Sequence, residues 1–110
     1  MERLPVLKGT LDVLVLKALS WGALHGFEIT RWLEDRSGGA LEVEDAAVYQ
    51  ALYRLEARGL IEAEWGMTEN NRRARYYAIT AAGRAHLRAE TRRLVRFAAT
   101  LTAVLQSGRA

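Results

Sequence analysis

Arginine accounts for most of the basic residues in this 110-residue chain, and it gathers toward the C-terminal end. Fourteen of the sixteen basic residues are arginine. Residues 72–110 hold nine arginines and one acidic residue, Glu90, whereas residues 1–71 hold seven basic and twelve acidic residues. The planar guanidinium group donates two parallel hydrogen bonds, which suits phosphates and the guanine edge. A genome rich in G and C would also favour arginine over lysine, but it does not explain the clustering, which predicts a polyanionic partner.

The segment 45–58 presents one face that could read DNA bases. At helical spacing its apolar residues form one stripe, and the opposite face is aromatic and hydrogen-bonding. That opposite face consists of Ala46, Tyr49, Gln50, Tyr53, Arg54 and Ala57. Gln50 and Arg54 are the candidates for base edges, because glutamine pairs with adenine and arginine with guanine. Tyr49 and Tyr53 either contact DNA through their hydroxyls or pack within the domain or a dimer.

Polar and basic residues between 66 and 75 form a second candidate group. The group consists of Asn70, Asn71, Arg72, Arg73 and Arg75. Arginine is attracted by the negative potential of a narrow minor groove. These residues therefore either contact phosphates and the minor groove or form a solvated hairpin tip. Five more arginines form either the exposed back of a C-terminal helix or a second DNA surface, namely Arg84, Arg88, Arg92, Arg93 and Arg96.

Other kinds of site find little support in the sequence. The chain has no cysteine, and its two histidines, His25 and His86, have no partners at metal-ligand spacing. No nucleophile–base pair or glycine-rich phosphate loop is present, so we expect neither enzymatic activity nor a cofactor nor a metal. No apolar run reaches the roughly 18 residues of a membrane span, and no signal-peptide pattern begins the chain. We therefore expect a cytoplasmic protein.

The elements that position these residues follow from periodicity and from helix start and stop signals. Leu4, Leu7, Leu11, Leu14 and Ala18 predict a helix over 4–20. Further helices are predicted over 26–36 and over 45–58, with Asp45 as the N-cap of the latter, and a very short strand over 41–44. Alternation predicts strands over 60–65 and 75–79, joined by the basic loop as a hairpin. A last helix, capped by Thr80, is predicted from 81 to about 106.

The first and last predicted helices carry more apolar surface than one small domain can cover. Leu87, Leu94 and Leu101 recur every seven residues in a helix roughly 39 Å long, so a second chain is the natural cover. The predicted homodimer interface consists of Leu4, Leu7, Leu11, Leu87, Leu94, Phe97, Ala98, Leu101 and Leu105. Leu7, Leu11, Phe97 and Leu101 line either a small-molecule effector pocket at this interface or a simple packed contact.

The order of elements predicts a mainly α fold with a small β-hairpin wing, that is, a winged helix-turn-helix followed by a long C-terminal helix. Residues 1–80 would form the DNA-binding domain, with the first helix also in the dimer interface. Residues 81–110 would form the dimerisation helix.

Three stretches of the chain are similar to the PadR-like transcriptional regulators, in their short form with one C-terminal helix. These stretches are Leu11–Leu19 with residues 25–29, Val48–Ile61, and Glu69–Tyr77 leading into residues 80–84. The resemblance implies a dimeric, cytoplasmic regulator, usually a repressor, that binds a palindromic operator in double-stranded DNA. Many such proteins are released by a small ligand.

The chain departs from this family at several positions. It has Ala46-Ala47 where hydroxyl residues or glycine are common, and Gln50 where proline is common. The tryptophan on the last helix with which multidrug-sensing relatives hold flat ligands is absent here. The sequence thus favours a DNA-binding regulator. A winged-helix module that binds proteins and not specific DNA remains the alternative, supported by the acidic N-terminal two-thirds and by Ala46-Ala47.

Overall fold

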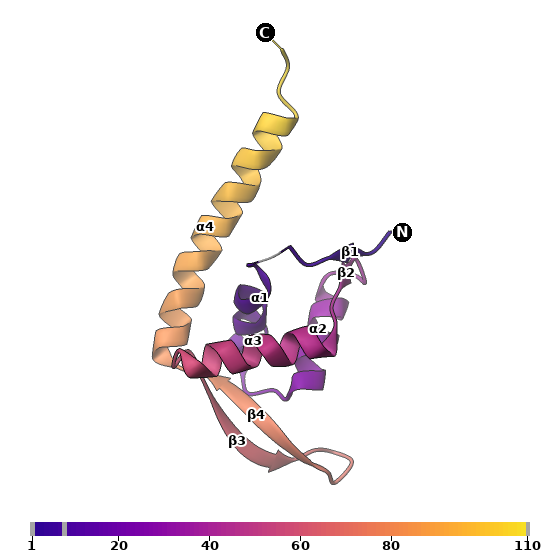
Figure 1. Cartoon of the computed structure of the whole chain (residues 1–110), viewed down its shortest axis with the longest axis vertical. Coiled ribbons are helices and arrows are strands. Elements are labelled where there is room, and N and C mark those ends of the chain that lie inside the picture. Colours follow the sequence, from indigo (N-terminus) through magenta and orange to yellow (C-terminus); the bar gives the residue numbers. More distant parts are fainter. Residues whose placement is uncertain (1, 8, 110) are drawn as a thin grey trace.

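The computed structural model describes residues 2–7 and 9–109, which form a small helical body, a β-hairpin and a projecting helix (Figure 1). The helices are α1 (Leu11–Ala18), the 3-10 turn η1 (Leu19–Trp21), α2 (Gly26–Arg36), α3 (Asp45–Ala57) and α4 (Ala81–Leu105). The strands are β1 (Leu4–Pro5), β2 (Leu41–Glu42), β3 (Ile61–Met67) and β4 (Arg73–Ile79). β1 pairs with β2 in parallel, and β3 pairs with β4 antiparallel.

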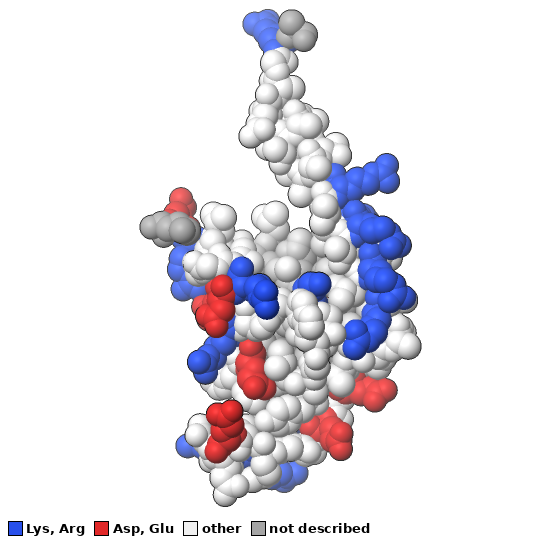
Figure 2. Space-filling model, turned by 180° about the vertical axis from the view of Figure 1, so that it is seen from behind, with Lys and Arg blue, Asp and Glu red and all other residues white. Residues whose placement is uncertain are grey.

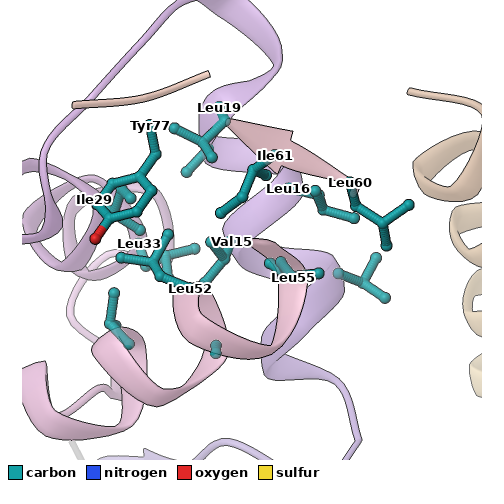
Figure 3. Close-up of a cluster of buried hydrophobic side chains, with 14 of the residues drawn as sticks. Val15, Leu16, Leu19, Ile29, Leu33, Leu52, Leu55, Leu60, Ile61 and Tyr77 are labelled. Atoms are coloured by element: carbon teal, nitrogen blue, oxygen red, sulfur yellow. The ribbon is translucent and has the colours of Figure 1, made fainter. Parts of the chain in front are cut away.

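The core lies where α1, α2, α3 and the base of the hairpin meet (Figure 3). Its largest fully buried side chains come from these elements and from η1, namely Val15, Leu16, Leu19, Ile29, Val48, Leu52, Leu55 and Ile61. On α3 the buried residues are those of the predicted apolar stripe, so the opposite face turns to solvent. Burial of this stripe fixes which side of α3 is presented.

Local signals set the ends of α2 and α3. The His25 backbone N–H donates to Glu28 Oε1 at 3.0 Å, and His25 Nδ1 accepts from the Glu28 backbone N–H at 3.3 Å, which makes a capping box. At the other end, Gly38 and Gly39 adopt positive φ angles of 64° and 79°. α3 corrects one prediction: Glu44 occupies the N-cap position without a side-chain cap bond, and Asp45 is the first helical residue. A carboxylate is also favourable there because it complements the helix dipole.

The N-terminal segment becomes helical only at Leu11, whereas the leucine spacing predicts a helix from residue 4. Leu4 and Pro5 instead pair in parallel with Leu41 and Glu42. Proline disfavours the helical conformation at the preceding residue, and Gly9 adopts a positive φ of 89°, so the chain changes direction between β1 and α1. The prediction of one helix over 4–20 was therefore wrong for its first turns.

The hairpin is longer than predicted, and its loop is shorter. β3 and β4 run in register from the Ile61–Ile79 pair to the Met67–Arg73 pair, leaving only residues 68–72 as the loop. Asn71, at φ 60°, makes the turn, and the Thr68 backbone N–H donates to the Arg72 carbonyl at 2.8 Å. At the base of the hairpin Leu24 bridges to Tyr77, which anchors the wing to the segment before α2.

α4 starts at the edge of the body, beside the end of α3 and the base of the hairpin, and then projects away from it (Figure 1). Thr80 Oγ1 caps the helix by accepting from the Gly83 N–H at 3.0 Å. Gly83 and Leu87 are buried and Leu94 packs against the core, but Phe97, Leu101, Val104 and Leu105 are exposed. The projection gives a radius of gyration of 15.8 Å, whereas a compact chain of this length would have about 13 Å.

The packing of Gly83 yields the first prediction. A Cβ at this position would lie 2.1 Å from the Leu60 carbonyl oxygen and 2.7 Å from Ile79 Cγ1. Because backbone cannot give way as a flexible side chain does, Gly83→Ala should lower the free energy of unfolding by about 3 kcal/mol. Urea denaturation measures this. Gly108→Ala is the matched control, since its Cβ would meet nothing within 4 Å. Equal denaturation midpoints for the two variants would contradict the prediction.

Candidate nucleic-acid interface

The outer face of α3 is exposed as the sequence predicts. Tyr49 and Tyr53 are 47% and 78% exposed, and Gln50 is also exposed. Ala46 and Ala57, near the two ends of this face, are exposed as well. The small side chain of Ala46 leaves room for close approach to the first turn of α3, where backbone N–H groups favour anions.

Tyr49 is held in place by the start of α2. A Cβ at Gly26 would lie 2.5 Å from Tyr49 Cζ and 2.7 Å from its hydroxyl oxygen, so the ring rests directly on Gly26. Partial burial, followed by the charges of Asp45 and Tyr77, raises the pKa of the Tyr49 hydroxyl. The hydroxyl, which like that of any tyrosine is protonated at neutral pH, can donate a hydrogen bond from a fixed position. Tyr49 therefore packs within the domain through its ring and is still 47% exposed.

Arg54 is not a free side chain on this face. Its Nη2 and Nε donate to the two Asp12 carboxylate oxygens at 2.7 and 3.3 Å, a fork that joins α3 to the first turn of α1. This hydrogen bonding raises the pKa of Arg54 further above its already high value. About half of the side chain remains exposed. This geometry orients the Arg54 guanidinium. It also means that any DNA group would have to compete with the Asp12 carboxylate for the hydrogen bonds of Arg54.

The wing carries the other predicted group. Asn70, Asn71, Arg72 and Arg73 are exposed at or beside the loop 68–72. Arg75 is instead partly buried: its Nη2 donates to Glu56 on α3 at 2.9 Å, and its guanidinium lies 5.5 Å from the Tyr77 ring centre. The Arg75–Glu56 pair braces the wing against α3.

Two large apolar side chains on the wing were not among the predicted site residues. Trp65 and Met67 are 58% and 56% exposed. They stand opposite Arg75 and Arg73 in the hairpin register, so these residues share one face of the wing. Arg73 stacks on Trp65 with 4.6 Å between guanidinium and ring centre. The alternation of Ile61 and Ala63 with Glu62 and Glu64, continued along the strand, would have placed both on this face.

Metal binding and membrane insertion would each leave a recognisable arrangement of side chains. Across residues 2–7 and 9–109, no group of three or more His, Asp or Glu side chains is arranged to hold a metal ion. None of the helices in those ranges is long and apolar enough to cross a membrane. The features concentrated on the exposed face of α3 and on the wing are hydrogen-bond donors, arginine and aromatic rings.

This arrangement agrees with a known family, the transcriptional regulator PadR-like family, whose sequence model matches residues 15–89. The chain belongs to the PadR-like family. An uncharacterized protein X from Lysinibacillus sphaericus is 30% identical over 87 residues, which cover 79% of this chain and 80% of that protein. The family is one of transcriptional regulators and not of enzymes, as the sequence predicts.

Solved PadR-like structures share the fold. A PadR family transcriptional regulator from Eggerthella lenta is 26% identical with a TM-score of 0.77, covering 92% of this chain and 86% of that one. Bacillus subtilis PadR, solved in complex with operator DNA, has a TM-score of 0.67 at 22% identity, covering 74% of this chain and 46% of that one. The predicted winged helix-turn-helix with a hairpin wing and a long last helix is confirmed.

The close contact between Gly26 and Tyr49 gives the second prediction. In the wild-type background, Gly26→Ala should push the Tyr49 ring outward and destabilise the domain, because the added Cβ occupies the space of the ring. In a Tyr49→Ala background the same change should cost about 1 kcal/mol less, a coupling typical of residues in contact. A double-mutant cycle by urea denaturation measures it. Additive effects would show that the ring does not rest on Gly26 in solution.

Proposed function

We propose that this PadR-like protein acts in the cytoplasm as a homodimeric DNA-binding regulator, with α3 in the major groove and the wing on a flanking minor groove. The main support is the ion pair between Arg75 on the wing and Glu56 on α3. This pair holds the exposed hydrogen-bonding face of α3 and the arginine-bearing wing in a fixed relation to each other. Bacillus subtilis PadR, which shares the fold, was solved with operator DNA. This supports the same use of the same elements here.

Within this interface the residues take different roles. Gln50, exposed in the middle of α3, reads a base edge. The hydroxyls of Tyr49 and Tyr53 and the orientated Arg54 contact the backbone or adjacent bases, while Ala46 lets the DNA approach α3. On the wing, Asn70, Asn71, Arg72 and Arg73 contact phosphates and the minor groove. Arg75 acts from its Glu56 pair as the support of the wing. Trp65 and Met67 add an apolar contact to the sugar edges of the groove.

The dimer is proposed from the apolar surface that α4 leaves uncovered. Phe97 and Leu105 are 61% and 74% exposed on the projecting half, and Leu101 and Ala98 lie on the same helix face. Leu4, Leu7 and Leu11 add apolar surface on the N-terminal segment. Leu87 does not belong to this surface, because it is buried in its own protomer, and Leu94 is largely covered by the same core.

The predicted division into a DNA-binding domain of residues 1–80 and a dimerisation helix of residues 81–110 is revised in this proposal. The first half of α4, up to Leu94, packs with the winged-helix domain, and only the remainder serves as the dimerisation arm. A two-fold dimer presents two α3 helices related by that axis, so the operator would be an inverted repeat. Occupation of such a site by a dimer would block other proteins from the same DNA, and we therefore assign the protein as a repressor.

A small-molecule effector at the dimer interface is part of the proposal. A cavity of about 300 Å³ lies between the N-terminal segment and α3, and its lining includes Leu7, Leu11 and Arg54. Because Arg54 is also on the DNA-binding face, a ligand in this cavity could alter the Asp12–Arg54 pair and so weaken operator binding. Phe97 and Leu101, the other two residues expected to line an effector pocket, do not line this cavity, which therefore connects only the N-terminal part of the proposed interface to the proposed DNA contacts.

The DNA-binding proposal gives the third prediction. Arg72→Ala and Arg73→Ala should weaken binding to all sequences, and each should lower the salt slope by roughly one because one phosphate is no longer neutralised. Gln50→Ala should cost about 1–3 kcal/mol on the operator and little on random DNA, because it removes a base contact. Gel shifts with the DNA upstream of the chain's own gene, over a salt series, measure both. Equal losses for Gln50→Ala on the two DNAs would refute base reading.

The same experiment separates the regulator from the alternative of a protein-binding module. If the wild-type protein binds its upstream DNA no better than random DNA of equal length, and the variants change nothing, the winged helix serves another partner. Competition with unlabelled random DNA makes this distinction quantitative.

The proposed dimer gives the fourth prediction. Leu101→Glu with Leu105→Glu should dissociate it, because two carboxylates would be buried without partners. Ala99→Glu with Ala103→Glu is the matched control, since helical geometry places these residues on the opposite side of the same turns. Light scattering at micromolar concentration measures the mass. A wild-type protein that is monomeric there, or an equal loss of mass in the control, would contradict the assignment of this face.

A further inference from the structure

Four arginines form an inclined row along α4. Arg84, Arg88, Arg92 and Arg96 follow one another at four-residue spacing, and all four are exposed. In an α-helix this spacing puts them on one side, with an axial rise of about 6 Å between neighbours. Figure 2 shows the basic side chains as a stripe along α4 when the molecule is seen from behind.

The row is not balanced by acidic residues on its own side of the helix. Glu90, the only acid on α4, is paired through its carboxylate with Arg93, which lies outside the row. The residues beside the arginines on the same side are Ala81, Ala85 and Ala89 and, near the outer end, the exposed Val95. Like charges at four-residue spacing destabilise a helix, and a solubilising face would alternate them with glutamate. An external anion would relieve this repulsion.

The row lies on a different side of α4 from most of the apolar face, and it borders that face only at its outer end, where Arg92, Arg96 and Phe97 line one surface hollow. Arg84 Nη1 donates to the Ser20 carbonyl at 3.1 Å, so the row begins beside η1. Glu90 lies on the other side of the helix and accepts a hydrogen bond from Arg93, which lowers the pKa of the Glu90 carboxylate. Helical geometry sets the row roughly opposite Leu94 and Leu101, and a dimer through the apolar face leaves it accessible.

We propose that Arg84, Arg88, Arg92 and Arg96 form a second, sequence-independent surface that binds the phosphate backbone of double-stranded DNA, separate from the α3–wing interface. A row of four guanidinium groups about 6 Å apart along the helix fits the regularly spaced phosphates of a linear polyanion better than the scattered carboxylates of a folded acidic protein. The inference rests on the proposed function only in taking DNA as the ligand. The phosphates could come from operator flanks or from a second duplex.

The test compares two double variants. The row variant carries Arg88→Gln and Arg92→Gln, and the control variant carries Arg31→Gln and Arg109→Gln, which remove the same charge from exposed positions elsewhere. Binding is measured over a salt series on a short operator duplex, on the operator with long flanks, and in a two-duplex capture assay. The row variant should lower the salt slope by about 2 on flanked DNA if it binds flanks. If the row instead binds a second duplex, the row variant should no longer capture that duplex in the two-duplex assay. The charge-matched control should resemble wild type in all three.

The outcomes separate the two proposals. A row variant that equals wild type in every arm, or a control that loses as much, overturns the second surface while leaving operator binding by α3 intact. A wild type that binds operator no better than random DNA, but whose residual binding depends on the row, overturns the α3 assignment and keeps the row. Circular dichroism and light scattering must show that both variants keep fold and mass, which their exposed positions predict.

Discussion

The joint between α3, the hairpin and α4 determines how the rest of the molecule is arranged. The Thr80 backbone N–H donates to the Leu60 carbonyl at 3.1 Å, and the Thr80 hydroxyl donates to the Gly59 carbonyl at 2.8 Å. Gly83 leaves no space between α4 and Leu60. The end of α3, the start of β3, the end of β4 and the start of α4 are thereby tied within a few residues. The angle between the proposed DNA-reading helix and the proposed dimerisation arm is set at this joint, so any side chain at Gly83 would disturb both.

The arginines of the proposed interface differ in how firmly they are held. Arg54 and Arg75 are each paired with a carboxylate of a neighbouring element, Asp12 and Glu56. Exposed ion pairs contribute only about 0–1 kcal/mol, which a DNA phosphate can match, so the pairs orient the side chains without locking them. The loop arginines have no comparable brace within residues 2–7 and 9–109, apart from the stacking of Arg73 on Trp65. The braced Arg54 on α3 suits a base position, because base contacts need the tighter geometry, and the looser arginines at the wing tip suit phosphates, while Arg75 holds the wing against α3.

Sequence periodicity was sufficient for most elements because each buries one clear face. It placed α2, α3 and the end of α4 to within a residue, and it found the hairpin but made both strands two residues too short at the loop. It failed before α1 because leucine spacing alone does not take account of Pro5 and Gly9, which stop the helix from extending toward Leu4. It could not assign Leu87 to the protomer core, since a heptad shows that a face is covered and not which chain covers it. The Arg54–Asp12 pair joins residues 42 positions apart, and no local pattern signals such a contact.

α4 combines faces with separate physical requirements, which explains why its sequence is neither a simple core helix nor a simple coiled coil. Its first turns satisfy the joint and the core with Gly83 and Leu87, and its outer half carries apolar residues that its own chain does not cover. The arginine row runs along a third side and costs helix stability through repulsion. Within residues 2–7 and 9–109, the only side-chain hydrogen bond made by this row is the one from Arg84 to the Ser20 carbonyl, and all four arginines are exposed. The fold therefore does not require four arginines at regular spacing there. Because their mutual repulsion destabilises the helix, a contact outside the protomer is the physical reason that remains for them.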